Sequence, residues 1–466
     1  MKNTLLITFL LLISFVARAQ DISGQWYGIL KISGAQLKLV LNLSKNGSGY
    51  AATLDSPDQG AKGIPVNSVE FSNSVLKIQL SGINAEYQGT LEAGNNFKGT
   101  FRQNGMSFPL DLGREVLEGT KALRPQEPAK PYSYYTEEVK FENKKDKITL
   151  AGTLSLPSKE GNYPVAILIS GSGPQNRDEE IMGHKPFLVI ADHLTKNGIA
   201  VLRYDDRGTA QSTGDFNAAT SREFATDVEA AISYLKTRKE VNVKKIGLIG
   251  HSEGGLIAPM VAADSKDVAF IVLLAGPGIP GDQIMIKQNR LIGKAGGIPD
   301  QALDKSEQMN RKVYAVLKQK LDLAETKKQI KVLLEEDHNN APAEQRLSDR
   351  DKEAVISRMV NSIVSPWTHF FLTYDPAPAL EKVKCPVLAL NGENDLQVPP
   401  KENLEAIKIA LEKGGNENFT TKDLPNLNHL FQESKTGSPN DYGKIEQTFS
   451  PSALSEVTTW INKIVK

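Results

Sequence analysis

The sequence predicts two folded domains of different class, an all-β domain followed by a larger α/β domain with a mostly parallel sheet. Between residues 20 and 114, short runs of alternating apolar and polar residues recur between Gly and Asn turns, and no helical periodicity is present. From residue 135 onward, near-continuous apolar runs of strand length alternate with amphipathic stretches of helix length. Buried strands between covering helices are typical of a parallel sheet with helices on both faces.

The length and composition fit this organisation. A chain of 466 residues is long enough for two or three domains, and 40% hydrophobic with 24% charged residues is ordinary for a globular protein, which excludes collagen and wholesale disorder. Lys plus Arg equal Asp plus Glu at 55 each, so charge gives no reason to expect nucleic acid or an anionic membrane as a partner. With one cysteine, Cys385, and six histidines at no metal-ligand spacing, we expect neither an intrachain disulfide nor a metal site.

The first element, residues 1–19, is typical of a secretory signal peptide. Lys2 precedes an apolar run at 5–16, and Ala17-Arg18-Ala19 forms a small-x-small cleavage site before residue 20. The run is shorter than the roughly 20 apolar residues that a membrane span needs. We therefore expect an exported protein, periplasmic or secreted, that keeps no membrane attachment after cleavage.

The second element, residues 20–114, is predicted to be a small β-barrel or β-sandwich. Its alternating runs lie at 36–43, 75–80, 86–91 and 97–101. The opening Gly24-Gln25-Trp26 resembles the strand start of lipocalin-like barrels. We find no catalytic set of residues here, so a folding or docking module is expected, with carbohydrate or partner binding as the alternative.

The next segment, residues 115–134, is predicted to be a linker. Three prolines fall within the seven residues 125–131, which favours a stiff, extended chain. The α/β domain then runs over residues 135–466. Its strand–helix alternation is broken at about 281–383 by a helical stretch rich in Lys, Gln and Glu, which we interpret as a cap inserted into the α/β domain.

One motif in the α/β domain has the form that places a serine at the end of a buried strand. Gly250-His251-Ser252-Glu253-Gly254 fits G-x-S-x-G and lies between an apolar strand run and a helical stretch. In that context the tight turn needs small flanking residues and lifts the serine hydroxyl out of the sheet. The sequence predicts Ser252 as a nucleophile, with the next helix N-terminus directed at negative charge forming nearby.

A nucleophilic serine needs a base. Three histidines follow Ser252 in the sequence. His338 lies in a charged helical stretch, and His369 lies among aromatic residues that are typical of packing. His429 lies in a loop between the last predicted strand and the last predicted helix, so we expect His429 to be the base.

The base in turn needs an orienting carboxylate, which in this kind of sheet comes between the serine and the histidine along the chain. Asp395 follows a Gly turn after the apolar strand at 386–390. We expect Asp395 to be the acid, with Glu393 as its rival.

An oxyanion hole requires two backbone N–H groups near the nucleophile. We expect one from Glu253, the residue after the serine. The other should come from the glycine-rich loop that follows the strand at 165–169, where Ser172 is the preferred donor and Gly171 or Gly173 are alternatives. The loop lacks the Gly-Lys-Ser/Thr of a phosphate-binding loop.

Three other polar groups are interpreted as structural. The arginine of Asp205-Asp206-Arg207 is expected to form an internal ion pair. The acidic run at 178–180 is expected to be solvated, with contact to a substrate amine as the alternative. His251, beside the nucleophile, is expected to serve packing.

These segments resemble a known group of enzymes. The runs at 170–178, 203–208 and 249–255 are similar to secreted bacterial α/β-hydrolases related to serine aminopeptidases and to the carboxylesterases of the same group. The resemblance covers about residues 135–466, and the segment 55–65 resembles the β-modules that precede such hydrolases. It implies an α/β-hydrolase fold and a Ser–Asp–His triad, and it leaves ester against peptide open because members cleave both.

The cap is expected to cover the site, because an insertion before the strand at 386–390 leaves the sheet at the same end as Ser252. An aromatic cluster precedes that strand: Trp367, Phe370, Phe371 and Tyr374. We expect these side chains to line an apolar acyl or aryl pocket. The alternative is that they only pack the cap onto the sheet.

The sequence therefore predicts an exported serine hydrolase that cleaves carboxylic esters through Ser252, His429 and Asp395 by way of an acyl-enzyme. No cofactor or metal is required by that chemistry, and the expected partner is a small-molecule ester or a short peptide. The first alternative is an aminopeptidase or dipeptidyl-peptidase-like hydrolase. The second is a catalytically inactive carbohydrate- or partner-binding protein, and the oligomeric state is not predicted.

Overall fold

The structure, a computed structural model, describes residues 21–32, 35–47, 49–57, 61–80, 83, 85–92, 95–103, 106–115, 124–319, 321–342, 346 and 349–466. The chain divides into two compact units, Met1–Glu118 and Gly119–Lys466. The expected signal peptide at 1–19 and residues 116–123 of the expected linker lie outside the described residues.

The first unit is built from antiparallel strands, as the alternating sequence predicted. They are β1 (Gly24–Ile32), β2 (Ala35–Asn46), β3 (Gly49–Ser56), β4 (Ala61–Pro65), β5 (Ser68–Ser72), β6 (Val75–Leu80), β7 (Ala85–Glu92), β8 (Asn96–Gln103) and β9 (Met106–Pro109). They form two sheets, of order β1-β2-β3-β4 and β5-β6-β7-β8-β9. Side chains of β7 alternate strictly between buried and exposed, the pattern of a sheet with one face on the core.

Both sheets of the first unit enclose one apolar core. Trp26, at the start of β1, is fully buried, and its ring centroid lies 4.5 Å from that of Phe97. Residues 112 and 113 bridge the two sheets, because Gly113 pairs with Tyr27 and Leu112 pairs with Phe97. The unit is thus a sandwich of two sheets bridged along one side.

The second unit contains an eight-stranded sheet. Its strands are β10 (Tyr135–Asn143), β11 (Ile148–Leu156), β12 (Tyr163–Ile169), β13 (Ala200–Tyr204), β14 (Val241–His251), β15 (Phe270–Leu274), β16 (Val387–Gly392) and β17 (Phe419–Leu424). The order is β10-β11-β13-β12-β14-β15-β16-β17, with antiparallel pairing at β10-β11-β13 and parallel pairing from β13 to β17. Every residue of β13, β15 and β16 is buried, which explains their near-continuous apolar sequences.

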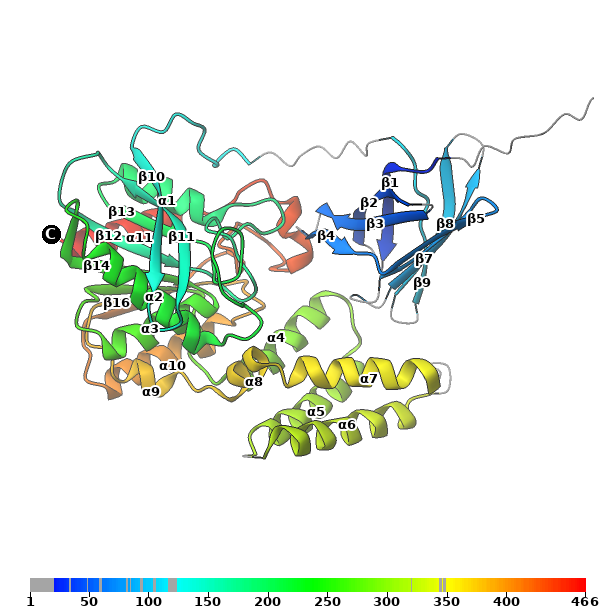
Figure 1. The fold of residues 1–466 in the computed structure, drawn as a ribbon. Helices are drawn as coiled ribbons and strands as arrows, with labels where there is room; N and C mark the ends of the chain where they lie inside the picture. Colours follow the sequence, from blue (N-terminus) through cyan, green and yellow to red (C-terminus); the bar gives the residue numbers. More distant parts are fainter. Residues whose placement is uncertain are drawn as a thin grey trace, which may run out of the picture. The chain divides into compact units, whose positions relative to one another are not determined.

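Helices cover both faces of this sheet (Figure 1), which confirms the predicted fold class. One face carries α2 (Ser221–Leu235), α3 (Glu253–Asp264) and α10 (Pro400–Lys413) on a core that includes Val228, Ile257 and Ile407. The other face carries α1 (Pro186–Lys196) and α11 (Pro451–Ile464), with Phe187 and Ile461 in a second core. The short 3-10 helix η4 (Pro439–Lys444) precedes α11.

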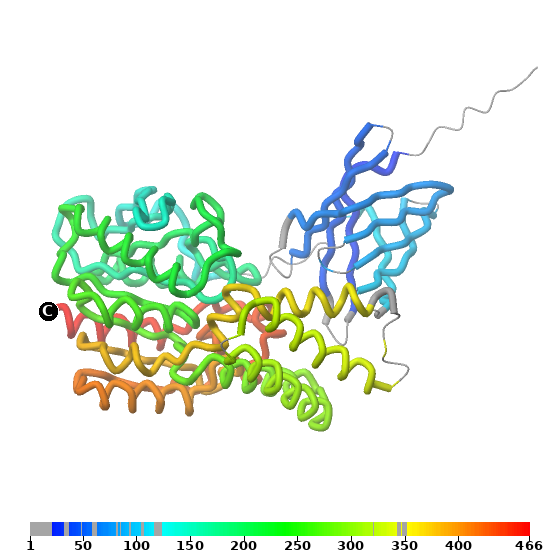
Figure 2. The backbone as a smooth tube through the Cα atoms, turned by 60° about the horizontal axis from the view of Figure 1, so that its bottom comes forward, coloured from blue at the N-terminus to red at the C-terminus, as the bar shows by residue number. Residues whose placement is uncertain are grey.

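Among the residues that the structure describes, six α-helices lie between β15 and β16, in the segment predicted to be the cap. They are α4 (Gly281–Ala295), α5 (Asp300–Leu317), α6 (Leu323–Asn340), α7 (Asp349–Ile363), α8 (Pro366–Thr373) and α9 (Ala377–Leu380). Figures 1 and 2 show α5, α6 and α7 running side by side as one group of long helices. Their shared core includes Val313, Ile330 and Ile356. Among the described residues, no helix is both long and apolar enough to cross a bilayer.

Arg207 forms the internal ion pair that the sequence analysis expected. Its Nε lies 2.8 Å from Asp227 Oδ2, and its Nη2 lies 2.7 Å from Asp146 Oδ2. The side chains of Arg207 and Asp227 are only 7% and 3% exposed. The pair ties the loop after β13 to α2, because Asp227 lies on that helix.

Replacing Asp227 by alanine should lower the free energy of unfolding by about 3–5 kcal/mol, because the guanidinium of Arg207 would stay buried without its main counter-charge. Urea-induced unfolding measures this change. The matched control is Asp215→Ala, an exposed aspartate for which a change within about 0.5 kcal/mol is expected. A loss below about 1 kcal/mol for Asp227→Ala would contradict a structural role for the pair.

Candidate active site

The turn between β14 and α3 holds Ser252 in a conformation that its neighbours enforce. Its backbone has φ 51° and ψ −117°, which is strained for a residue with a side chain. A Cβ at Gly250 would lie 2.0 Å from the carbonyl oxygen of Gly254, and a Cβ at Gly254 would lie 2.1 Å from that of Ile169. Only glycine fits at both flanks, as the G-x-S-x-G pattern requires.

The predicted acid and the predicted base are in direct contact. Asp395 follows β16, His429 follows β17, and His429 Nδ1 lies 2.8 Å from Asp395 Oδ2. Asp395 Oδ1 also accepts the backbone N–H groups of Gln397 and Val398, at 2.8 and 2.9 Å. Both side chains of the pair are nearly inaccessible to solvent, at 5% and 0% exposed. With Nδ1–H donated to the carboxylate, a neutral His429 keeps the Nε2 lone pair for another proton.

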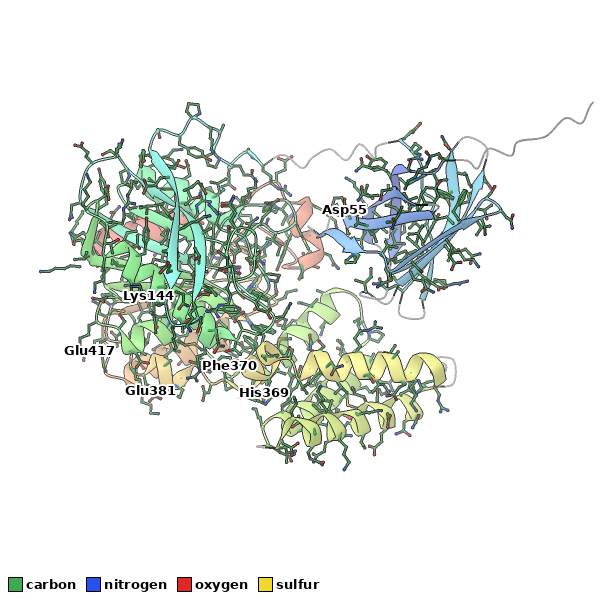
Figure 3. The ribbon with its side chains drawn as sticks, viewed as in Figure 1. Asp55, Lys144, His369, Phe370, Glu381 and Glu417 are labelled. Carbon is green, nitrogen blue, oxygen red and sulfur yellow. The ribbon has the colours of Figure 1, made fainter. Side chains whose placement is uncertain are left out.

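The remaining candidates for these roles lie elsewhere. Glu393 is exposed, and its Oε2 accepts the backbone N–H of Asn426. His338 lies in α6, and His369 is exposed on α8, where Figure 3 labels it. The geometry therefore favours Asp395 over Glu393 and His429 over the other two histidines.

His251 brings the base to the nucleophile turn. Its ring centroid lies 4.9 Å from that of His429, and its Nε2 lies 3.0 Å from the His429 carbonyl oxygen. Because His251 precedes Ser252 in the chain, this contact places the loop of the predicted base against the predicted nucleophile.

The predicted oxyanion loop passes beside the same turn. A Cβ at Gly171 would lie 3.2 Å from Ser252 Cβ, so the two backbones are in close approach. The Gly171 N–H is already donated to Glu179 Oε1, at 2.7 Å. Gly171 is therefore the weakest of the three proposed donors in this loop, and Ser172 and Gly173 remain. The Ser172 side chain acts to lower the pKa of Glu253, so the two predicted oxyanion residues are neighbours.

Glu253 ties the nucleophile turn to the cap. Its buried carboxylate accepts Ser221 Oγ–H at 2.5 Å, and the Trp367 indole N–H lies 2.9 Å from each of its two oxygens. Burial raises the pKa of Glu253, and the hydrogen bonds from Ser221 and Trp367 oppose that rise. No local pattern in the sequence predicts the bond from Trp367, since this residue lies 114 residues beyond Glu253.

The four predicted pocket aromatics divide between two faces of the α8 region. Trp367 stacks on Phe371, and Phe370 stacks on Tyr374, each with 5.2 Å between ring centroids. Trp367 and Phe371 line a cavity of about 390 Å³ inside the cap, whose other walls include three methionines, Met285, Met309 and Met359. Phe370 does not line that cavity and instead lies under the Arg222 guanidinium of α2, 5.8 Å from it.

The acidic run at 178–180 is not the solvated segment that the sequence analysis expected. Glu179 is buried and contacts His251 Nδ1 at 2.9 Å, and Asp178 forms an ion pair with Arg203. Only Glu180 is exposed. The expectation was wrong because a run of like charges does not reveal which side chains have buried partners. His251 is buried and packs against the ring of His429, as expected, and it also has hydrogen-bond contacts to Glu179 and the His429 carbonyl.

Comparison with known proteins now identifies the family. The family model described as X-Pro dipeptidyl-peptidase (S15 family) matches residues 129–414, which is more than half of the chain. The chain belongs to the S15 family. The S15 match starts after the all-β unit, covers β10 to β16, the nucleophile turn and the cap, and ends before β17.

Curated relatives of this S15 chain include an esterase. Esterase EstD of Thermotoga maritima is 26% identical over 408 residues, which cover 86% of this chain and 88% of the relative. A putative carboxymethylenebutenolidase of Synechocystis sp. is 29% identical over 139 residues, 28% of this chain and 56% of the relative. The S15 chain is a serine hydrolase, and the names of its family and of its relatives include both peptidase and esterase.

Solved structures similar to the S15 chain include two hydrolases. A Pyrococcus furiosus esterase is 16% identical, with a TM-score of 0.42 and coverage of 71% of this chain and 93% of its own. The α/β hydrolase GrgF of Penicillium sp. is 17% identical, with a TM-score of 0.42 and coverage of 71% and 96%.

Proposed function

We propose that this S15 chain is an exported carboxylesterase. Ser252 Oγ attacks the ester carbonyl carbon while His429 Nε2 takes the hydroxyl proton, and Asp395 holds the imidazole in the required tautomer. The N–H groups of Ser172 and Glu253 stabilise the oxyanion.

The reaction then proceeds through an acyl-enzyme. The tetrahedral intermediate collapses, and His429 returns the proton to the departing alcohol oxygen. A water molecule, deprotonated by His429, attacks the acyl carbon and releases the carboxylic acid, which restores the Ser252 hydroxyl.

One observation carries the preference for esters over peptides. An aminopeptidase or dipeptidyl peptidase binds its substrate more tightly when the site has a carboxylate without an internal partner. Such a carboxylate can form an ion pair with the terminal ammonium group of the substrate. Three carboxylates beside the nucleophile turn and the oxyanion loop have internal partners. Glu179 binds Gly171 N–H and His251, Glu253 binds Ser221 and Trp367, and Asp206 binds Ser170 Oγ and the Gln175 N–H.

The pKa shifts of two of these carboxylates also favour an ester substrate over a peptide with a free amine. Burial raises the pKa of Asp206 well above its usual range, and it raises the pKa of Glu253. Raised values mean that the environment disfavours the ionised form that would attract an ammonium group. Uncharged ester substrates fit this environment better than free α-amines.

The test compares matched substrates that share one leaving group. Alanine p-nitrophenyl ester is assayed with its α-amine free and with the amine acetylated, together with the two corresponding p-nitroanilides. We expect the kcat/KM of the acetylated ester to be at least equal to that of the free-amine ester. Preference for the free amine in both the ester and the anilide would support the aminopeptidase alternative instead.

A fluorophosphonate probe separates the enzyme from the inactive binding protein. Labelling of the wild-type chain that is lost in Ser252→Ala supports a reactive serine. Absence of labelling in folded wild-type protein would favour the carbohydrate- or partner-binding alternative. Export is tested separately, by the expected mature N-terminus at Gln20.

The cap cavity of about 390 Å³ supports an apolar acyl or aryl group as part of the substrate. Trp367 forms one wall of the cavity and also donates to Glu253, the neighbour of Ser252, so this wall of the cavity contacts the nucleophile turn. Its methionine-rich lining suits flexible apolar groups of varied shape.

Adjacent phenylalanines in α8 provide a matched test of this pocket. Phe371→Leu should shift the ratio of kcat/KM for octanoyl over acetyl p-nitrophenyl esters by roughly 10-fold, because a lining side chain changes size. Phe370→Leu, on the other face, should leave that ratio within about twofold. Equal ratios in both variants, with only the melting temperature changed, would place the substrate pocket outside this cavity.

A further inference from the structure

Beside the nucleophile turn, four groups form one continuous chain of hydrogen bonds. The Gly171 N–H donates to Glu179 Oε1 at 2.7 Å, and the same oxygen lies 2.9 Å from His251 Nδ1. His251 Nε2 then lies 3.0 Å from the carbonyl oxygen of His429. The chain joins the oxyanion loop, the residue before Ser252 and the loop of the predicted base.

Both ring nitrogens of His251 have a hydrogen-bond partner. A backbone carbonyl oxygen only accepts hydrogen bonds, so the Nε2 of His251 carries a hydrogen. Glu179 Oε1 lies within hydrogen-bond distance of both Gly171 N and His251 Nδ1. Burial alone lowers the pKa of a histidine, but the Glu179 carboxylate and the His429 carbonyl outweigh it and raise the pKa of His251.

Resting on the proposed esterase function, we infer that Glu179 and His251 are a positioning pair for catalysis. Glu179 fixes the Ser170–Gly171 peptide through its N–H, which sets where the next N–H, that of Ser172, lies. His251 holds the loop of His429 through its carbonyl. The pair thus aligns the oxyanion donor and the base on Ser252, without touching the substrate itself.

The position of the pair in the chain supports this role. Glu179 and His251 are 72 residues apart, and His251 and His429 are 178 residues apart, so the two bonds join three separate segments. Both residues are buried, at 4% and 7% exposed, and the hydrogen bonds are therefore shielded from competing water. Misplacement of a reacting group by about 1 Å costs on the order of 100-fold in rate, which sets the expected size of the effect.

The experiment replaces Glu179 with a residue that keeps or removes the acceptor for Gly171. Glu179→Leu should lower kcat by roughly 100-fold while KM stays within about threefold, because substrate contacts are unchanged and only alignment is lost. Glu179→Gln keeps an acceptor oxygen and should lose only about 10-fold. The matched control is Glu180→Gln, an exposed neighbour of the same type, which should retain wild-type kcat.

A double variant separates positioning from general stability. If the pair acts as a unit, Glu179→Leu combined with His251→Leu should lower kcat no further than the worse single variant does. Each kcat is expressed per folded molecule, with the folded fraction taken from near-ultraviolet circular dichroism and thermal melting. Losses in kcat that multiply in the double variant would show two independent effects and overturn the proposal.

Three further outcomes distinguish the positioning role from the esterase function. Wild-type kcat in folded Glu179→Leu would overturn the positioning role while leaving the esterase proposal intact, provided that Ser252→Ala is inactive. Failure of the near-isosteric Glu179→Gln to fold would show that the pair maintains the fold rather than the site, and this too would overturn it. Full activity in Ser252→Ala would instead remove the proposed function itself.

Discussion

Replacing Ser252 by alanine is expected to abolish ester hydrolysis almost completely, with a loss in kcat on the order of 10⁴-fold or more. The variant lacks the oxygen that forms the acyl-enzyme, whereas the turn that holds it is set by Gly250 and Gly254 and should persist. Hydrolysis of p-nitrophenyl acetate by folded protein measures the change. Alanine also relieves none of the backbone strain at φ 51°, so stability should change little.

His429→Ala should cause a loss of similar size, and the double variant should be scarcely worse than either single one, because nucleophile and base act in the same step. This non-additivity distinguishes a catalytic unit from two residues that each support the fold. A double variant whose loss equals the product of the single losses would contradict the assignment.

Asp395→Asn is expected to lower kcat by about 10⁴-fold with the fold retained. Asp395 accepts hydrogen bonds from His429 and from two backbone N–H groups, and an amide in its place must direct an NH₂ group at one of these donors. The favoured arrangement reverses the imidazole tautomer, so that Nε2 carries a proton when it should accept one.

The matched control for this variant is two residues away. Glu393→Gln changes an exposed carboxylate that contacts the Asn426 backbone and should alter kcat by less than about threefold. Near wild-type turnover in folded Asp395→Asn would move the acid role to another residue, and a large loss in Glu393→Gln would name that residue.

The fold and the main candidates for the site could be predicted because they depend on local patterns. Apolar runs identified the buried parallel strands, and the carboxyl ends of parallel strands meet at one edge of a sheet. Ser252, Asp395 and His429 each follow such a strand end, so chain order and loop position sufficed to select them.

The supporting contacts could not be predicted in the same way. The bonds from Glu179 to His251 and from Trp367 to Glu253 join residues 72 and 114 positions apart, and neither pair has a periodic signature. The acidic run at 178–180 illustrates the cause, since a sequence shows charge directly but shows burial only through apolar periodicity.

By contrast, the sequence does predict that the four cap aromatics lie on two different faces of the α8 region. Trp367 and Phe371 are four residues apart, as are Phe370 and Tyr374, and side chains at that spacing share a helix face. The expectation that all four aromatics line one pocket did not take this spacing into account.

Because Trp367 is hydrogen-bonded to Glu253, its fluorescence should depend on the position of the cap. The sequence contains three tryptophans, and of these Trp26 lies in the core of the β-sandwich while Trp460 lies on α11, packed against the core around Phe270. Only Trp367 joins the cap to the nucleophile turn, so only its indole would exchange a buried carboxylate for water if α8 lifted. Intrinsic fluorescence therefore carries a signal of cap position without an added dye, against a background from two tryptophans that do not move with α8.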